Sequence, residues 1–182
     1  MHFRFLIIVS CLLLICIPCL ALADTVPDGN SKGGALWPDS RFTDNGDDTM
    51  TDRITGLVWP QEGGAVSVGS CRGGTKSWDG AREYVRCLND QGYLGYADWR
   101  LPTVKELKSL INPGEANSAQ RLNGLGFRTV RSSEYWSSTS YDSVKGYAWV
   151  VGLWVGGTDC SNMEYHYQAW PVRGGAMIRG VK

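Results

Sequence analysis

The chain contains little histidine and no excess of charge of either sign. Two of its 182 residues are histidine, and only His166 lies beyond the N-terminal apolar segment. Nucleophilic catalysis by serine or cysteine needs a nearby base, so we expect His166 to be a surface or packing residue and the protein not to be an enzyme. Its 18 basic residues balance 18 acidic residues. Because proteins that bind nucleic acid usually carry a strongly basic surface, no nucleic-acid partner is expected.

Cysteine is scarce outside the first 23 residues, which hold three of the six. The others, Cys71, Cys87 and Cys160, form no CxxC pair or Cys/His cluster of the kind that binds zinc, so no metal or cofactor is expected. An exported chain with three cysteines closes one disulfide and leaves one thiol over. A Cys71–Cys87 bond would close a loop and, in the chain-entropy model, stabilise the folded protein by about 3 kcal/mol. A Cys87–Cys160 bond would instead tie a helix to a distant strand, and the sequence leaves both pairings open.

The N-terminus predicts export. Residues 5–22 are almost continuously apolar, and Ala21 and Ala23 are the small residues that signal peptidase reads, so residues 1–23 are predicted to be a cleaved signal peptide. Two alternatives are an uncleaved membrane anchor, because the run is about long enough to span a bilayer, and a lipoprotein anchored through Cys19. We therefore expect the protein in the periplasm, at the cell surface or secreted, with membrane contact only through an uncleaved N-terminal segment.

Composition divides the rest of the chain into three parts. Residues 24–40 are rich in Gly, Pro, Asp and Ser and predict a flexible leader. Residues 41–175 have the length of one domain with one sizeable core. Residues 176–182 form a short tail.

The start of this domain predicts a hairpin. Residues 41–44 and 49–52 are short strand-like segments around an Asn-Gly turn. Four aspartates cluster here, and such a cluster can indicate calcium because hard cations bind clustered oxygens. Their spacing does not match an EF-hand loop. Because aspartates at turns are explained by local hydrogen bonds to the backbone, we favour the turn interpretation for Asp44, Asp47, Asp48 and Asp52.

A short helix is predicted to begin at Thr103. Pro102 disfavours helical backbone at Leu101, and Thr103 and Glu106 have the spacing of a capping box. The turn at residues 112–114 ends this helix.

Another helix is expected between Ser77, which can cap it, and Gly92, which ends it. Its apolar positions recur at helical spacing, and they are Trp78, Ala81, Val85 and Leu88. The stretches 61–76 and 115–131 lack such periodicity and predict loops.

The last third of the chain predicts strands. Residues 147–155 are apolar on both alternating faces, as expected of a central strand covered on two sides. A turn follows, and residues 163–173 predict further strand. Strands, two helices and strands again indicate an α+β domain in which two short helices pack on a twisted antiparallel sheet.

Five segments of the chain form a recognisable series. They are Arg-Phe-Thr-Asp-Asn-Gly-Asp-Asp-Thr at 41–49, Thr-Gly-Leu-Val-Trp at 55–59, Asp-Trp-Arg-Leu-Pro-Thr at 98–103, Tyr-Trp-Ser-Ser-Thr at 135–139 and Val-Arg-Gly-Gly at 172–175. Taken together and in this order, they resemble the Lcl C-terminal domain family of bacteria. The resemblance covers roughly residues 41–175. It implies a C-type-lectin-like fold, export from the cell and an adhesive role, since the founding member binds sulfated polysaccharides through this domain.

Three differences from lectin-like proteins bear on this resemblance. The family usually has a cysteine where this chain has Pro171, so the family's disulfide pattern does not carry over. Calcium-dependent lectins share a Glu-Pro-Asn or Gln-Pro-Asp triplet followed by Trp-Asn-Asp, and neither occurs here. Formylglycine-generating enzymes share the lectin-like fold but need two cysteines close together in the C-terminal region, where this chain has only Cys160.

The ligand-binding face of lectin-like folds is built from the loop after the second helix and the last strands. By that resemblance the expected binding residues are Tyr141, Lys145, Trp154, Tyr165 and Tyr167. Arg100 and Arg173 lie inside fold motifs and are expected to bond internally. Three other cations are expected to be freer than Arg100 and Arg173 to contact sulfate or carboxylate groups. They are Arg128, Arg131 and Lys145. We expect core positions for Trp59, Trp78, Trp99, Trp136 and Trp149, and alternation along the strand leaves Trp154 equally suited to core or surface.

These features favour an exported adhesion module that binds an anionic polysaccharide or a cell-surface protein without metal. One alternative is a structural or protein-interaction domain in a cell-envelope assembly. Others are a formylglycine-generating-enzyme-like oxidase and a displayed variable protein made by a retroelement. The oligomeric state is not predicted.

Overall fold

The computed structural model of the protein describes residues 39–154 and 156–175. The predicted signal peptide, residues 24–38 of the predicted leader and the tail at residues 176–182 lie outside the described residues.

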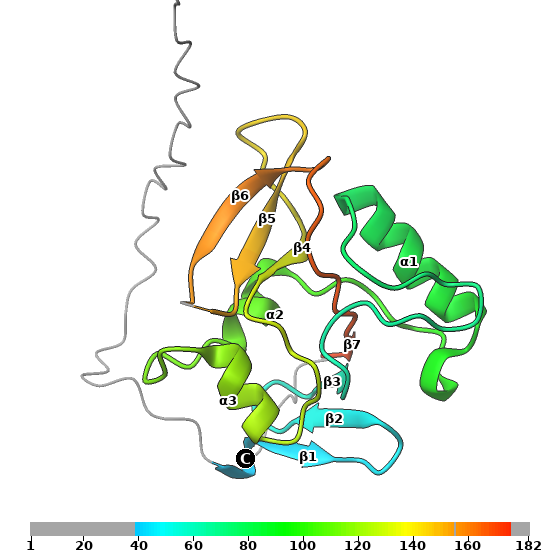
Figure 1. Ribbon diagram of the computed structural model, residues 1–182, viewed down its shortest axis with the longest axis vertical. Helices are drawn as coiled ribbons and strands as arrows, with labels where there is room; N and C mark the ends of the chain where they lie inside the picture. The colour runs from blue at the N-terminus through cyan, green and yellow to red at the C-terminus, as the bar shows by residue number, and fades with distance from the viewer. Residues whose placement is uncertain (1–38, 155, 176–182) are drawn as a thin grey trace, which may run out of the picture.

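Two antiparallel sheets form the body of the protein, as Figure 1 shows. The four-stranded sheet has the order β1-β2-β3-β7, with strands β1 (Phe42–Asp44), β2 (Thr49–Asp52), β3 (Leu57–Pro60) and β7 (Arg173–Gly174). The three-stranded sheet has the order β4-β5-β6, with strands β4 (Glu134–Ser140), β5 (Tyr147–Gly152) and β6 (Thr158–Asn162). The predicted α+β class is confirmed, but the strands form two sheets where one was expected.

The predicted first hairpin is confirmed as β1 and β2, which pair from Phe42 opposite Asp52 to Asp44 opposite Met50. The aspartates around its turn bond to the nearby backbone: Asp44 accepts from the N–H of Gly46 and Asp47 from that of Thr49. This is the turn role that their spacing indicated. Among the described residues, no three His, Cys, Asp or Glu side chains are grouped so that they could hold a metal ion.

The predicted central strand is confirmed as β5, which lies between β4 and β6. It ends at Gly152 rather than at residue 155, because the chain turns at residues 153–154. The prediction of strand at residues 163–173 holds only in part: β7 begins at Arg173, and before it the range has only isolated β-bridges, at Tyr167, Gln168 and Val172. The third strand is β6, and its polar sequence Thr-Asp-Cys-Ser-Asn gave no apolar alternation because β6 lies at the edge of its sheet.

Both predicted helices are confirmed. Helix α1 (Trp78–Asp90) is capped by the Ser77 side chain, which accepts a hydrogen bond from the N–H of Gly80. Helix α2 (Val104–Ser109) follows Thr103, and the capping box with Glu106 is complete in both directions. These short caps fix where each helix begins.

A third helix, α3 (Ser118–Gly124), lies in the stretch that was predicted to be a loop. The Asn117 side chain caps it by accepting from the N–H of Gln120. It buries only Ser118, Ala119 and Leu122. Two apolar side chains in seven residues are too few to show helical periodicity in the sequence, so the prediction of a loop there was wrong.

The buried side chains form two clusters. In the first, Trp170 contacts Trp59, with ring centroids 5.2 Å apart, and donates from its indole N–H to the carbonyl of Pro60. The second lies against α1 and includes Trp99 and Trp136. The core positions of Trp59, Trp99 and Trp136 are confirmed, whereas two others are only half-buried, namely Trp78 and Trp149.

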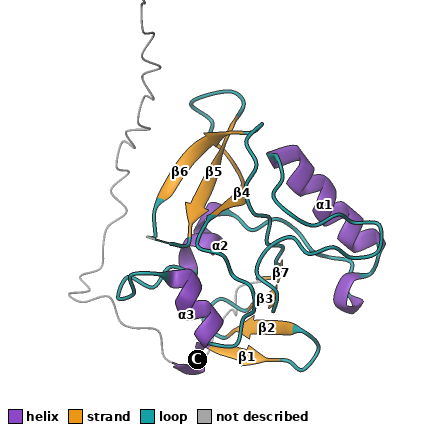
Figure 2. Cartoon of the chain, in the orientation of Figure 1, coloured by secondary structure: helices purple, strands orange, loops and turns teal. Residues whose placement is uncertain are grey.

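A disulfide between Cys71 and Cys87 joins the loop after β3 to helix α1, with 5.8 Å between the Cα atoms. It decides between the two pairings that the sequence left open, and Cys160 on β6 takes no part in it. The loop that it fastens runs from β3 to α1 without helix or strand, as predicted (Figure 2). None of the helices in the described residues has the length and hydrophobicity to cross a membrane.

Candidate functional site

A groove of about 520 Å³ runs beside helix α1. One wall is a single face of that helix, because Val85 and Arg86 lie three and four residues after Arg82, and Asn89 lies four and three residues after them. The other wall is the extended segment that leads into α2, together with Ser138 of β4.

Hydrogen bonds at two places hold the walls of this groove. The Asn89 side chain accepts from the N–H of Trp99 at 2.8 Å and donates to its carbonyl at 2.9 Å. The N–H of Ser138 donates to the carbonyl of Pro102 at 2.7 Å. The extended segment is therefore fixed to α1 at one end and to β4 at the other, so the groove is built into the fold.

The α1 wall carries two arginines one helical turn apart. The Arg82 guanidinium lies 4.9 Å from the ring centroid of Trp78 and 3.4 Å from a carboxylate oxygen of Asp79. The side chains of Arg82 and Asp79 are 55% and 76% exposed, so this ion pair is weak in water. Arg86 is exposed, and its side chain makes no hydrogen bond or ion pair with any described residue.

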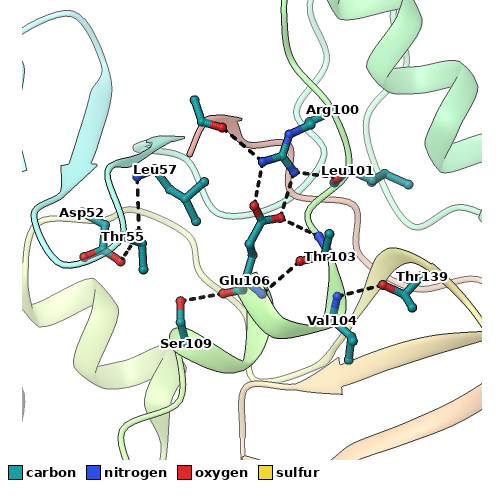
Figure 3. A network of polar contacts seen from close by, with 11 residues as sticks. Asp52, Thr55, Leu57, Arg100, Leu101, Thr103, Val104, Glu106, Ser109 and Thr139 are labelled. Atoms are coloured by element: carbon teal, nitrogen blue, oxygen red, sulfur yellow. Dashed lines mark hydrogen bonds and ion pairs between the residues drawn. The ribbon is translucent and has the colours of Figure 1, made fainter. Parts of the chain in front are cut away.

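The facing wall carries Arg100, whose guanidinium is already paired (Figure 3). It donates to both carboxylate oxygens of Glu106, at 2.8 and 2.6 Å, and to the carbonyl of Gly174 at 3.2 Å. The hydrogen bond to Glu106 raises the pKa of Arg100. Burial acts to raise the pKa of Glu106, but the Arg100 hydrogen bond and charge and the Thr103 N–H together lower it. Arg100 and Glu106 thus form a charge-neutral unit.

Arg173 is paired in the same way, because it donates to both oxygens of Asp98 at 2.7 and 3.1 Å. Its guanidinium also lies 3.8 Å from the ring centroid of Tyr96. The expectation that Arg100 and Arg173 bond internally is confirmed. Neither is available as an open anion ligand without breaking an ion pair.

The groove lining combines apolar and neutral polar groups with these cations. Val85, Trp99 and Leu101 are buried and supply its apolar part. Thr103 and Ser138 are exposed and supply two hydroxyl groups. The lining includes no histidine, cysteine or carboxylate. Guanidinium groups beside apolar surface and hydroxyl groups are a combination that suits an anionic ligand.

The structure separates the binding residues that were predicted from the sequence. Tyr141 and Lys145 lie in the β4–β5 connection, at the top of Figure 1, and Tyr165 lies close by after β6. Tyr165 is 61% exposed, whereas Tyr141 is half-buried, its ring edge-on to Trp149. Trp154 is 46% exposed and lies at the opposite end of the same sheet. These four residues do not form one patch.

Tyr167 is half-buried, with its ring 5.0 Å from that of Trp136. Arg128 was expected to be freer than Arg100, but it forms ion pairs with Asp48 at 2.6 Å and Glu62 at 3.1 Å. Arg131 is exposed, and both its N–H and its carbonyl bond to the hydroxyl of Tyr135. Arg128, Arg131 and Tyr167 do not line the groove.

Sequence reasoning missed Arg82 and Arg86. The signal was present, because two arginines four residues apart border the apolar positions of a helix that was predicted correctly. The facing wall was not predictable, since it comes from a segment of residues 99–103 that only the tertiary fold brings beside α1.

The family model of the Lcl C-terminal domain matches residues 48–173. This range contains both walls of the groove and the disulfide. The search of curated proteins found no match.

Proposed function

Because this chain belongs to the Lcl C-terminal domain family, we propose that it is an exported, non-catalytic binding module that attaches to anionic polysaccharides through the groove beside α1. The cations of the groove would bind the acidic groups directly, without a bridging metal ion. The disulfide is compatible with an exported protein, because such bonds persist in oxidising compartments.

One observation carries this proposal: the helical wall of the groove presents Arg82 and also Arg86, which forms no ion pair with a carboxylate of the described residues. Arginine is suited to sulfate and carboxylate because its planar guanidinium donates two parallel hydrogen bonds. The apolar lining and the hydroxyls of Thr103 and Ser138 suit sugar rings, which carry C–H faces and hydroxyl groups. A groove, unlike a closed cavity, also accepts a chain that continues at both ends.

The first test measures binding to immobilised heparin and dextran sulfate at low salt, with neutral dextran as the uncharged comparison. We expect the wild-type protein to bind both anionic polymers and not neutral dextran. Arg86→Gln should weaken binding about tenfold, because a loss of that size corresponds to the free energy of one charge-assisted hydrogen bond. The matched control is Arg53→Gln, which removes the same charge from an exposed turn outside the groove.

A second test leaves the arginines intact. Ser138→Asp places a carboxylate in the groove and should weaken binding to heparin by repulsion and by occupying Arg82 or Arg86. Ser143→Asp adds the same charge in the exposed β4–β5 connection and should have little effect. No retention of the wild-type protein on either polymer, or equal effects of the groove and control variants, would contradict the proposed site.

A second candidate function is supported by a different surface. Val144 is 45% exposed and Tyr165 is 61% exposed, and both lie in connections at the end of the three-stranded sheet that includes the β4–β5 connection. Tyrosine anchors are common at protein interfaces, which favours a protein partner in a cell-envelope assembly. Crosslinking in native membranes should then trap a partner through this end, and a Val144→Ser/Tyr165→Ser variant should lose it. An unchanged crosslink would remove this candidate.

A further inference from the structure

We infer that the groove recognises acidic groups along only one edge of its ligand, and that hydroxyl groups along the other edge meet the facing wall. This inference rests on the proposed function and concerns how the same groove reads its ligand. It assigns the anion contacts to Arg82 and Arg86 and a hydroxyl contact to Ser138, while the charge of Arg100 stays paired with Glu106.

The asymmetry follows from the pairing of the three arginines. Arg100 is engaged by both oxygens of Glu106, and Glu106 also accepts from the N–H of Thr103 at 2.7 Å as half of the α2 capping box (Figure 3). A ligand that drew Arg100 away would leave the Glu106 charge unpaired. The positive charge open to a ligand therefore lies on the α1 wall alone.

The spacing of that charge is fixed by the helix. Arg82 and Arg86 are four residues apart on α1, which places them about 6 Å apart along the helix axis. Across the groove, the Ser138 hydroxyl makes no hydrogen bond with any described residue. Such walls fit a saccharide chain with acidic groups along one edge and hydroxyl groups along the other better than a chain that is acidic on all sides.

The test uses the salt dependence of binding to a short heparin oligosaccharide. In counterion-release analysis, each cation that contacts an acidic group adds about one unit to the slope of log K against log salt. We expect a slope near two for the wild-type protein and near one for Arg82→Gln or Arg86→Gln.

The decisive variant is Glu106→Gln. Glutamine also serves in a capping box, so α2 keeps its cap while Arg100 loses its neutralising partner. The heparin probe carries acidic groups on more than one edge, so a freed Arg100 should contact one of them; we expect the slope to rise by about one unit and affinity at low salt to rise about tenfold. An unchanged or smaller slope in a folded Glu106→Gln protein would overturn the inference. If that variant does not fold, Arg100→Lys, which keeps the charge but not the two-pronged pairing, should leave the slope within half a unit of wild type, and a larger change overturns the inference.

The contact between the Ser138 hydroxyl and the ligand is tested separately. Ser138→Ala should weaken heparin binding about threefold to tenfold, as expected for one lost hydrogen bond, and should not change binding to polyglutamate, which lacks hydroxyl groups. Equal losses for both polymers, or none, would overturn this part. Failure of the wild-type protein to bind heparin at all would instead overturn the proposed function, and this inference with it.

Discussion

Removing the Cys71–Cys87 disulfide should destabilise the domain and loosen the wall that carries the arginines. The bond joins residues 16 apart in sequence, and the chain-entropy relation gives about 3 kcal/mol for a loop of this size. For a domain of this length that corresponds to a fall in Tm of roughly 10 °C. Because Cys87 lies next to Arg86 on α1, a looser loop should also reduce heparin binding.

The assay is urea unfolding of the wild-type protein and of the Cys71→Ala/Cys87→Ala double variant, in the absence of reductant. The control is Cys160→Ala, since Cys160 takes no part in the bond, and its unfolding free energy should stay within about 1 kcal/mol of wild type. Peptide mapping without reduction should recover a linked peptide containing both Cys71 and Cys87. A peptide linking Cys87 to Cys160, or a loss below about 1 kcal/mol in the double variant, would refute the reasoning.

The remaining predictions concern stability. Asp52→Asn breaks the buried ion pair with Arg41 and should cost about 3–5 kcal/mol in urea unfolding. The pKa values of Asp52 and Glu106 are both lowered, so their stabilisation is present above about pH 5 and lost as pH falls through the folded-state values; unfolding midpoints that stay constant from pH 5 to 3 would contradict this. Trp154→Ala should cost less than about 1 kcal/mol, whereas Trp170→Ala, at a fully buried side chain, should cost about 3–5 kcal/mol.

Local signals in the sequence predicted the elements that depend on neighbouring residues. The capping box of Thr103 and Glu106 located α2, and the Asn-Gly turn located the first hairpin. Predictions failed where stability comes from distant contacts. Helix α3 needs the carbonyl of Leu153, which accepts from the N–H of Ala119, and the edge strand β6 needs β5 as its partner. Neither contact leaves a periodic pattern in the sequence.

In the candidate site, too, the features that depend on neighbouring residues were predictable and those that depend on distant contacts were not. The arginines of α1 were visible in the sequence, but their place in a groove was not, because the facing wall comes from residues 99–103 and from Ser138, which are distant along the chain. The predicted aromatic face was distributed by the fold over two ends of one sheet, at Tyr165 and at Trp154. Arg128, expected to be available, is held by Asp48 and Glu62. Sequence spacing alone does not determine which side chains converge or which charges are already paired.

The segments that carry the family resemblance mostly build the scaffold. Within them, Asp98 and Arg173 pair with each other across the domain, Arg100 pairs with Glu106, and Trp136 is fully buried. The arginines that line the α1 wall lie outside those segments. The family segments therefore supply the scaffold beside the groove, whereas the proposed function assigns ligand selection to exposed residues of α1 outside those segments. It follows that exchanging the exposed face of α1 should change what the domain binds while leaving its fold intact.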